Sequence, residues 1–400
     1  MKNKFNMIYC KKCVIPNTRP NIEFDIHGIC SACNSSKIKK KIKWSERKKL
    51  FLNILKKHKK LNKNNDYNCI VPVSGGKDSV YQLYQMKKKF RMKPLAITWR
   101  TLARTQQGEK NLTALKNIGV DHIDFTVNPE IINDITKKSF LKFGDSSYID
   151  HLCIYNLIPN LAVKFKIPLI VWGENMFFEY GGYKKESNQR TQTSKLINNH
   201  HILKNYVAEK WLSKKISKKD ISPFASPDEK KLRLIKYEPI YLGYYFPWDI
   251  KQNHKIAKKV GFRARESGPI MGLYRESDID CMNIVIHHYF KWLKFGFNRV
   301  TDHASNEIRK GRLSRKKAIK LIDKFDGLKP PKEYIRSFCK QINITEIKFW
   351  EIANKFRNKK IWKKNGKKEW YIENWIAGDK KVDKFKHVKL SKKEKIFFNN

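Results

Sequence analysis

The stretch Cys69-Ile70-Val71-Pro72-Val73-Ser74-Gly75-Gly76-Lys77-Asp78-Ser79 decides the fold of this 400-residue chain. Its first five residues are an unbroken apolar run, which is typical of a parallel strand buried on both faces. Apolar residues at helical spacing then follow: Val80, Leu83, Tyr84 and Met86. Two glycines between a strand and a helix let the backbone approach an anion, toward which the first N–H groups of the helix point. The sequence therefore predicts a phosphate-binding loop at residues 74–79.

The side chains of this loop narrow the class of phosphate site. Lys77 adds a positive charge, and Ser74 and Ser79 add hydroxyl donors. A Walker A loop has four residues between its first glycine and Gly-Lys-Ser/Thr. Here no glycine lies upstream at that distance, and Asp78 separates the lysine from the serine. The loop is therefore not of the kinase or GTPase type, and a glycine turn without a ligand is the alternative interpretation.

Apolar runs and helical periodicities alternate after the loop. We expect strands at 94–98, 122–126 and 168–172, and helices at 109–117, 129–143 and 154–165. This alternation predicts an α/β fold with a doubly wound parallel sheet, whose ligands lie at the carboxyl ends of the strands. Gly173-Glu174-Asn175 follows the last of these strands, and residues 179–182 come just beyond, so we expect this segment to face the same crevice as the loop. A helix-capping carboxylate is the alternative for Glu174.

Four of the eight cysteines lie near the N-terminus as two pairs, Cys10-x-x-Cys13 and Cys30-x-x-Cys33. This is zinc-ribbon spacing, in which each pair directs two thiolates at one tetrahedral ion. With all four positions filled by protein, we expect a structural zinc site. A disulfide framework is the weaker interpretation for a cytosolic chain, and redox-active or coincidental cysteines are a further alternative.

The other four cysteines are isolated in the sequence. Cys69 lies in an apolar run, where we expect it to be a core residue. Cys153 is the one candidate nucleophile among them. Cys281 and Cys339 stand alone, so we expect no second zinc ribbon.

The formal net charge of +49 first suggests a nucleic-acid partner. The excess is mostly lysine spread along the whole chain, whereas an RNA groove concentrates arginine between aromatic residues. A basic surface with such a partner therefore stays open but is not favoured. No apolar stretch has the length of a membrane span and no signal peptide is visible, so we expect a soluble, cytoplasmic protein.

We divide the chain into four units. They are a zinc ribbon at 1–45, a nucleotide-binding α/β domain at 46–250, a helical region at 251–362 and a basic tail at 363–400, of which the part after Gly378 is expected to be frayed.

The loop at 74–79 resembles the PP-loop of ATP pyrophosphatases, whose pattern is Ser-Gly-Gly-x-Asp-Ser after the first strand. The resemblance implies that the loop holds the pyrophosphate leaving group of ATP, with Lys77 and Asp78 catalytic and Asp78 holding Mg²⁺. It also implies that residues 98–100, ending the second strand, cradle adenine and ribose. The ATP-binding residues expected on this basis are Ser74, Gly75, Gly76, Lys77, Asp78, Ser79, Thr98, Trp99, Gly173, Glu174 and Asn175.

A more detailed resemblance covers the chain from Tyr9 to about Trp362. Segments 9–33, 67–84, 119–130, 167–175, 179–182 and 287–319 together are similar to the bacterial N-acetyl sugar amidotransferase family. Members convert the acetamido group of a nucleotide-activated sugar into an acetamidino group, in lipopolysaccharide or flagellar pseudaminic-acid pathways. The resemblance implies ATP, Mg²⁺ and structural zinc as cofactors. It also implies two partners, an ammonia-supplying glutaminase subunit and its cyclase-like companion, because no glutaminase site is visible here.

Segment 287–319 discriminates best between families. Apolar residues at helical spacing predict a helix over 282–295, and Asp302 is a candidate N-cap for a helix through Arg309. Between them lies a polar cluster of Arg299, Asp302 and His303, next to Lys294, whose cations could meet a sugar carboxylate or a nucleotide phosphate. A basic surface turn is the alternative.

A PP-loop tRNA thiolase is the competing function. The positive charge and the N-terminal zinc knuckles favour it. Such enzymes usually carry a central pair of cysteines for sulfur chemistry, however, and the middle of this chain offers only Cys153.

Overall fold

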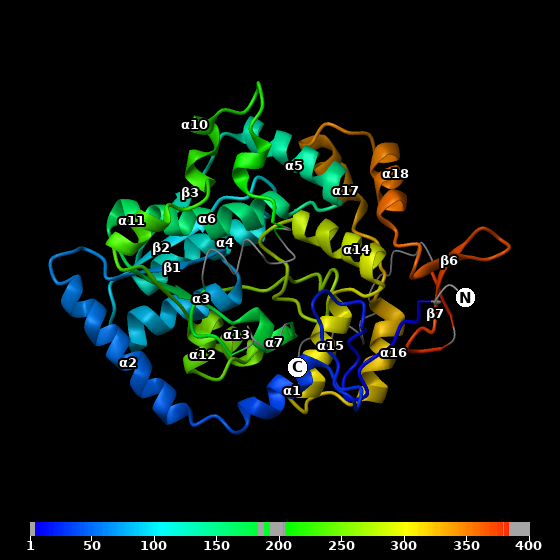
Figure 1. Cartoon of the computed structure of the whole chain (residues 1–400), viewed down its shortest axis with the longest axis horizontal. Helices are drawn as coiled ribbons and strands as arrows, with labels where there is room; N and C mark the ends of the chain where they lie inside the picture. Colours follow the sequence, from blue (N-terminus) through cyan, green and yellow to red (C-terminus); the bar gives the residue numbers. More distant parts are fainter. Residues whose placement is uncertain (1–4, 183–187, 193–202, 204, 379, 384–400) are drawn as a thin grey trace.

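The computed structural model describes residues 5–182, 188–192, 203, 205–378 and 380–383. An α/β unit occupies one side of the molecule and the C-terminal helices occupy the other (Figure 1). The cysteine-rich N-terminal segment lies against α15 (Arg299–Arg309) and α16 (Arg315–Phe325). Arg315 at the start of α16 donates a hydrogen bond from its Nε to the carbonyl of Cys13 in this segment. The N-terminal segment is thus braced by the C-terminal region rather than standing alone.

A five-stranded parallel sheet forms the α/β unit, in the order β3-β2-β1-β4-β5. The strands are β1 (Cys69–Pro72), β2 (Pro94–Trp99), β3 (Asp121–Phe125), β4 (Leu169–Trp172) and β5 (Glu238–Tyr241). The predicted parallel α/β sheet is confirmed, and β5 is an addition that the sequence did not indicate. Because the strand order reverses between β1 and β4, the loops that follow these two strands meet in one crevice.

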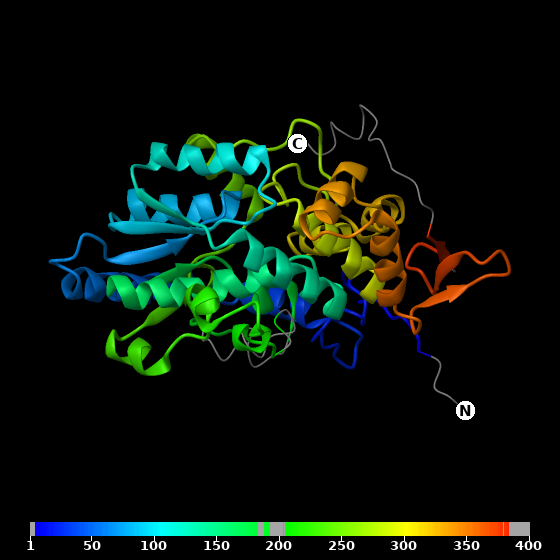
Figure 2. The ribbon, with the colours of Figure 1, turned by 90° about the horizontal axis from the view of Figure 1, so that it is seen from above.

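Helices cover both faces of this sheet (Figure 2). Ile70 packs with α5 (Pro129–Phe143) and α6 (Tyr148–Phe165), whereas Cys69 and Val71 pack on the opposite face with α2 (Trp44–Leu61) and α3 (Lys77–Tyr84). Successive β1 side chains point to opposite faces, and both faces are dry. This accounts for the unbroken apolar run at 69–73.

Helix boundaries agree with the sequence in part. The helix predicted over 129–143 is observed with those bounds, and Asn128 caps it by accepting the N–H of Glu130. The helix expected at 109–117 is α4 (Gln106–Thr113) followed by a 3-10 turn (Ala114–Ile118), and α6 begins at Tyr148 rather than at 154. The further helices of this half are α1 (Ser31–Lys39), α7 (Met176–Tyr180), α10 (Lys218–Ile221), α11 (Glu229–Leu234), α12 (Leu242–Tyr245) and α13 (Ile250–Lys259).

The C-terminal region packs around the fully buried Trp292. Its helices are α14 (Asn283–Phe295), α15, α16, α17 (Lys332–Gln341) and α18 (Glu346–Phe356). The predicted N-cap of α15 is wrong: the cap is Asn298, whose side chain accepts the N–H of Arg299. Asp302 lies within the first turn of the helix and is buried, and its carboxylate pairs with other side chains instead of capping the helix.

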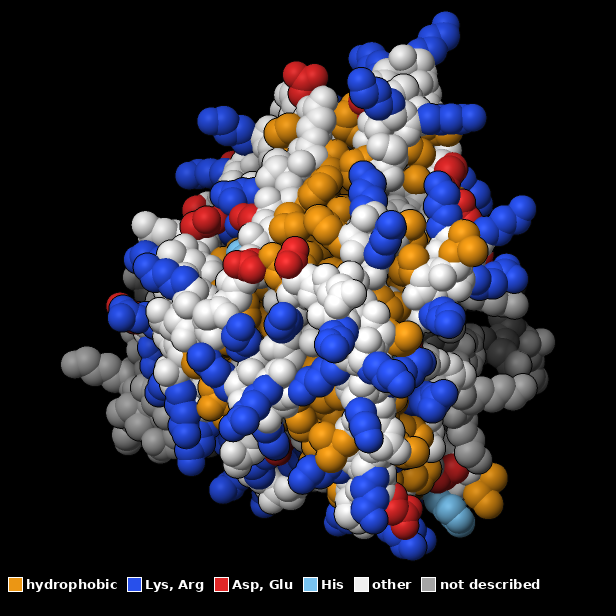
Figure 3. Space-filling model, turned by 90° about the vertical axis from the view of Figure 1, so that its left-hand side faces the viewer, with side chains coloured by type: hydrophobic (Ala, Val, Ile, Leu, Met, Phe, Trp, Pro, Cys, Tyr) orange, Lys and Arg blue, Asp and Glu red, His pale blue; other side chains and the backbone are white. Residues whose placement is uncertain are grey.

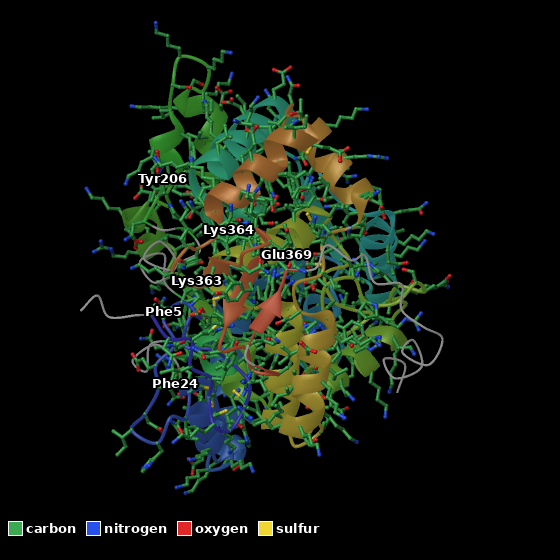
Figure 4. The ribbon with its side chains drawn as sticks, turned by 90° about the vertical axis from the view of Figure 1, so that its right-hand side faces the viewer. Phe5, Phe24, Tyr206, Lys363, Lys364 and Glu369 are labelled. Carbon is green, nitrogen blue, oxygen red and sulfur yellow. The ribbon has the colours of Figure 1, made fainter. Side chains whose placement is uncertain are left out.

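A small antiparallel sheet replaces much of the expected basic tail. It consists of β6 (Trp362–Lys364), β7 (Trp370–Glu373) and β8 (Lys380–Val382). Ile372 and Trp375 are buried in the same core as Trp292, which explains why the segment is ordered despite its lysines. Figure 4 views the molecule from this end, with Lys363 and Lys364 labelled on β6. We expected the chain after Gly378 to be frayed, but β8 lies within this stretch, and residues 379 and 384–400 lie outside the described residues.

The basic side chains do not gather into one patch on the face shown in Figure 3. Lysine and arginine are spread over that whole face, with a few acidic side chains between them. Among the described residues, no helix combines the length and the apolarity needed to cross a bilayer.

Candidate functional site

The loop between β1 and α3 is shaped by its own residues. Gly75 has a φ of +80°, and a Cβ there would lie 3.0 Å from Leu112 Cγ and 3.1 Å from the carbonyl oxygen of Gly108. Ser79 Oγ donates to the carbonyl of Gly76 at 2.9 Å, and Ser74 Oγ accepts the N–H of Gly76 at 3.3 Å. The turn therefore requires glycine and is held in shape before any ligand binds.

A cavity of about 340 Å³ lies over this loop, at the carboxyl ends of β1, β2 and β4. We call it the loop cavity. Its walls include three loop residues, three aromatic residues and two residues after β4: Ser74, Asp78, Ser79, Trp99, Tyr155, Trp172, Gly173 and Glu174. Hydroxyl groups beside a helix N-terminus suit phosphates, and aromatic walls suit a planar base, so the cavity has the chemistry of a nucleotide site.

Lys77 and Asp78 form an ion pair beside this cavity, in which only the lysine is buried. Lys77 is only 6% exposed, and its Nζ lies 2.8 Å from Asp78 Oδ2. Burial disfavours the charged lysine, but the charge of Asp78 outweighs this and raises the pKa of Lys77. The other carboxylate oxygen of Asp78 accepts Nδ2 of Asn253 at 2.8 Å. Helix α13 therefore positions Asp78, a role that the sequence did not reveal.

The structure does not bring two of the expected nucleotide contacts, Thr98 and Asn175, to the walls of the loop cavity. Thr98 does not line the loop cavity, because its hydroxyl donates to the carbonyl of Val73 at 2.8 Å within the sheet. Asn175 is 3% exposed and accepts the N–H groups of Phe177 and Phe178 as the N-cap of α7. Both residues therefore hold the backbone that surrounds the site instead of reaching into it.

Glu174 is the residue at which two cavities meet. The helix-capping alternative for Glu174 does not hold, because the N-cap of α7 is the next residue, Asn175. Its pKa is raised to about 7, first by burial and then by the nearby charge of Asp78. A cation between such carboxylates would relieve their repulsion, and carboxylate oxygens are the ligands Mg²⁺ prefers.

A second cavity, of about 310 Å³, shares Glu174 and Met176 with the loop cavity. We call it the polar cavity. Its walls come from the N-terminal segment, from α6 and the turn before it, and from α7, α14 and α15. They include Arg19, Asp145, His151, Tyr180, His287, Lys291, Phe297, Arg299 and Asp302. Basic and acidic groups alternate with aromatic rings, which suits a polyhydroxylated or anionic ligand.

Asp302 organises the cations of the polar cavity. Its side chain is 4% exposed and contacts both Arg19 Nη1, at 2.5 Å, and Lys291 Nζ. Burial alone would raise its pKa, but Lys291 and Arg19 outweigh burial and hold the pKa well below the usual range. Arg299 is half-buried and its Nε lies 3.3 Å from Asp278 Oδ2, whose charge outweighs burial and raises the pKa of the guanidinium above its usual range. These groups are therefore fixed in place, which excludes the alternative of a basic surface turn.

His303 is not part of the polar cavity, contrary to expectation. It is 1% exposed, its Nδ1 accepts the N–H of Leu273 at 3.0 Å, and its ring lies 4.2 Å from that of Tyr274. Arg19 takes its place as a site residue that sequence reasoning missed. Arg19 sits in the loop between Cys13 and Cys30, so the cysteine unit contributes directly to the cavity.

The four N-terminal cysteines form one buried cluster, as predicted. Their sulfur atoms all lie within 4.8 Å of one another, with Cys10 and Cys33 at 4.0 Å and Cys13 and Cys30 at 3.7 Å. Tetrahedral zinc with Zn–S bonds of about 2.3 Å needs sulfur separations of roughly 3.8 Å. The cluster therefore fits a structural zinc ion, and the nearby charge of Arg309 would offset the thiolates.

The remaining cysteines do not form a reactive site. Cys69, Cys153, Cys281 and Cys339 are all buried, and burial raises the pKa of each thiol. A thiol that stays protonated is a poor nucleophile. This argues against Cys153 as a nucleophile.

Residues 254–376 match the family described as LPS biosynthesis protein WbpG-like, C-terminal domain. A comparison with curated proteins finds no match. The matched residues include α14, α15 and the first two strands of the small sheet, and thus one wall of the polar cavity. This similarity indicates a role in polysaccharide biosynthesis.

Proposed function

We propose that this chain is an ATP-dependent, AMP-forming amidotransferase of surface-polysaccharide precursors. It would adenylate the acetamido oxygen of a nucleotide-activated N-acetyl sugar and replace that oxygen with nitrogen from ammonia. The observation that carries the proposal is the pair of cavities that meet at Glu174, one suited to a nucleotide and the other to a polar acceptor. Such a junction brings the α-phosphate of one ligand to an atom of the other.

The loop cavity is the proposed ATP site. The N–H groups at the start of α3, with Ser74 and Ser79, would hold the pyrophosphate, and the aromatic walls would hold the base. The ammonium group of Lys77, which Asp78 holds by an ion pair, would lie near the leaving group and offset its negative charge. Asp78 and Glu174 would hold Mg²⁺, which when bound neutralises charge that builds up on the phosphates.

The polar cavity is the proposed acceptor site. Arg19, Lys291 and Arg299 are fixed by Asp302 and Asp278, so their N–H groups are available to a ligand without a large entropic cost. The similarity of residues 254–376 to a domain of lipopolysaccharide biosynthesis proteins supports a sugar as that ligand.

The proposed reaction proceeds in two steps. The acetamido oxygen attacks the α-phosphorus and pyrophosphate leaves. Ammonia then adds to the activated carbon, the adduct gives up one proton, and AMP departs with the oxygen. Because Glu174 would be a ligand of Mg²⁺ in this scheme, that proton passes to water. We further propose that a glutaminase subunit with a cyclase-like companion supplies the ammonia, in the cytoplasm where nucleotide sugars are made.

The competing tRNA thiolase is less well supported. Sulfur transfer requires a thiol that ionises, whereas Cys153 and Cys281 are buried with raised pKa values. The basic charge is spread over the face in Figure 3 instead of forming a groove with aromatic side chains.

Nucleotide products test the proposal. Purified protein with ATP, Mg²⁺ and ammonium chloride should release AMP and pyrophosphate when a nucleotide-linked N-acetyl sugar is added, and far less without it. Release of ADP, or AMP release that depends on tRNA and sulfide instead of sugar, would contradict it.

A further inference from the structure

A third cavity, of about 210 Å³, adjoins both of the others. It shares Ser74, Trp99 and Ile154 with the loop cavity and His151 with the polar cavity. Its remaining walls are Thr98, Thr101, Arg104, Ser147, Asp150, Asp280, Cys281 and Ile284. We call it the acidic chamber. Its position gives it access to the point where nucleotide and acceptor would react.

The acidic chamber is lined by two carboxylates. Asp150 accepts the indole N–H of Trp99 at 3.0 Å and has no cationic partner among the described residues. Asp280 also lines the chamber. The one guanidinium in the wall, that of Arg104, already forms two ion pairs. Its Nη1 lies 2.5 Å from Asp124 Oδ2 and 3.1 Å from Glu109 Oε2. Burial raises the pKa of Asp150 to about 6, and it also raises the pKa of Asp280 against the opposing effects of Ser74 and Arg265.

Two buried polar atoms in the chamber wall have no partner. Ser147 is 2% exposed, and its Oγ makes no hydrogen bond although it stands at the N-cap of α6, where a serine usually caps the helix. His151 Nδ1 is also buried and unpaired. Burial holds the pKa of His151 at about 4, so the ring is neutral and offers a lone pair. Unsatisfied buried groups of this kind point to a missing ligand.

We propose that the acidic chamber binds ammonium, that the carboxylate of Asp150 takes one of its protons, and that the neutral ammonia so formed passes to the reaction centre. Ammonium is a small cation with four N–H donors, which matches two carboxylates, an unpaired hydroxyl and an unpaired imidazole nitrogen. The chamber is the smallest of the three cavities and too acidic for a phosphate. His151 belongs to the walls of both the chamber and the polar cavity, and therefore marks the route from ammonium to acceptor. This inference rests on the proposed amidotransferase reaction.

The test measures the dependence of amidine formation on ammonium chloride, at constant ionic strength and saturating ATP and sugar. Asp150→Asn keeps an oxygen for the Trp99 N–H but removes the charge. It should raise the KM for ammonium about tenfold, the size of one charge-assisted hydrogen bond, with the KM for ATP within about twofold. Ser147→Ala should raise the ammonium KM by about threefold. Asp121→Asn, an exposed carboxylate on β3, is the matched control and should change neither constant.

The outcomes separate this inference from the function on which it rests. If wild-type protein forms no amidine at any ammonium concentration, the proposed function fails. If the wild type is active but both variants keep the wild-type KM for ammonium, the acidic chamber is not the ammonium site. Should Asp150→Asn fail to fold, Ser147→Ala decides alone, because it removes only an unpaired hydroxyl.

Discussion

The loop cavity and the polar cavity adjoin one another but are built in different ways. The loop cavity takes its phosphate-facing groups from one continuous stretch, residues 74–79, placed at the end of a strand. The polar cavity is assembled from three regions. The cysteine unit contributes Arg19, the segment after β4 contributes Glu174, and the C-terminal helices contribute Lys291, Arg299 and Asp302. A local site can be recognised from a motif, whereas an assembled site depends on how distant segments pack. The two cavities should therefore respond differently to mutation.

The largest expected effect is that of Asp78→Ala in the loop cavity. The substitution removes the carboxylate that Lys77 and Asn253 hold in place and that would bind Mg²⁺. AMP formation should fall by about 10²–10³-fold, the usual consequence of losing one preorganised charge-stabilising group. Zinc content, measured by atomic emission, should stay at that of the wild type, since the cysteine cluster is separate. Activity within tenfold of wild type would contradict the role given to Asp78.

Arg19→Ala should act on the polar cavity alone. It removes one of the two cations that contact Asp302 and leaves Lys291 in place. The KM for the sugar should rise about tenfold while the KM for ATP stays within about twofold. Arg19→Lys keeps the charge but not the planar geometry, so its KM for the sugar should lie between those of the wild type and Arg19→Ala. An equal rise in both constants would mean that the two cavities are not separate sites.

Removing zinc should reproduce part of the Arg19 effect, because the loop that carries Arg19 is tied at Cys13 and Cys30. Protein stripped with a chelator should lose sugar affinity by a few-fold and show a lower Tm, with ATP affinity little changed. The comparison uses equilibrium binding of each ligand, so that loss of turnover does not mask it. If ATP affinity falls as much as sugar affinity, zinc supports the fold as a whole.

A smaller effect concerns Glu174, which belongs to both cavities. Its pKa is raised from 4.5 to about 7, so its contribution to stability is full below about pH 4 and is lost as the pH rises through 7. Glu174→Gln has no carboxyl group to ionise, so the variant does not lose this stability as the pH rises. Without Mg²⁺ the variant should melt a few degrees above wild type at pH 8, on the order of 2–4 °C, and at the same temperature near pH 4. A constant difference across this range would contradict the assigned pKa.

Much of the fold and half of the site were predictable because their signals are local. The apolar run of β1, the glycine turn and the paired cysteines each depend on neighbours in sequence. β5 was not predicted because Glu238-Pro239-Ile240-Tyr241 is short and contains a proline.

The assembled parts of the site left no such signal. Asn253 and Arg19 become site residues only through packing, and α15 is buried on so many sides that its polar residues do not reveal which face lines a cavity. For this reason Asp302 lines the polar cavity as expected, whereas His303, one residue later, does not.

The smallest effect should come from Cys153→Ala. Its thiol is buried in the core of the α/β unit and its pKa is raised, so it takes no part in the proposed chemistry. Turnover should stay within about twofold, and the free energy of unfolding should fall by roughly 1 kcal/mol for a small buried side chain. Loss of activity in a variant that still folds would favour the thiolase.

The most direct test of the central claim follows nitrogen into the sugar. Wild-type protein is incubated with ATP, Mg²⁺, ¹⁵N-labelled ammonium chloride and a set of nucleotide-linked N-acetyl sugars, and the products are weighed by mass spectrometry. We predict that one sugar gains a single ¹⁵N in exchange for its acetamido oxygen, with AMP formed in equal amount. AMP formation without any ¹⁵N in a sugar would contradict the account.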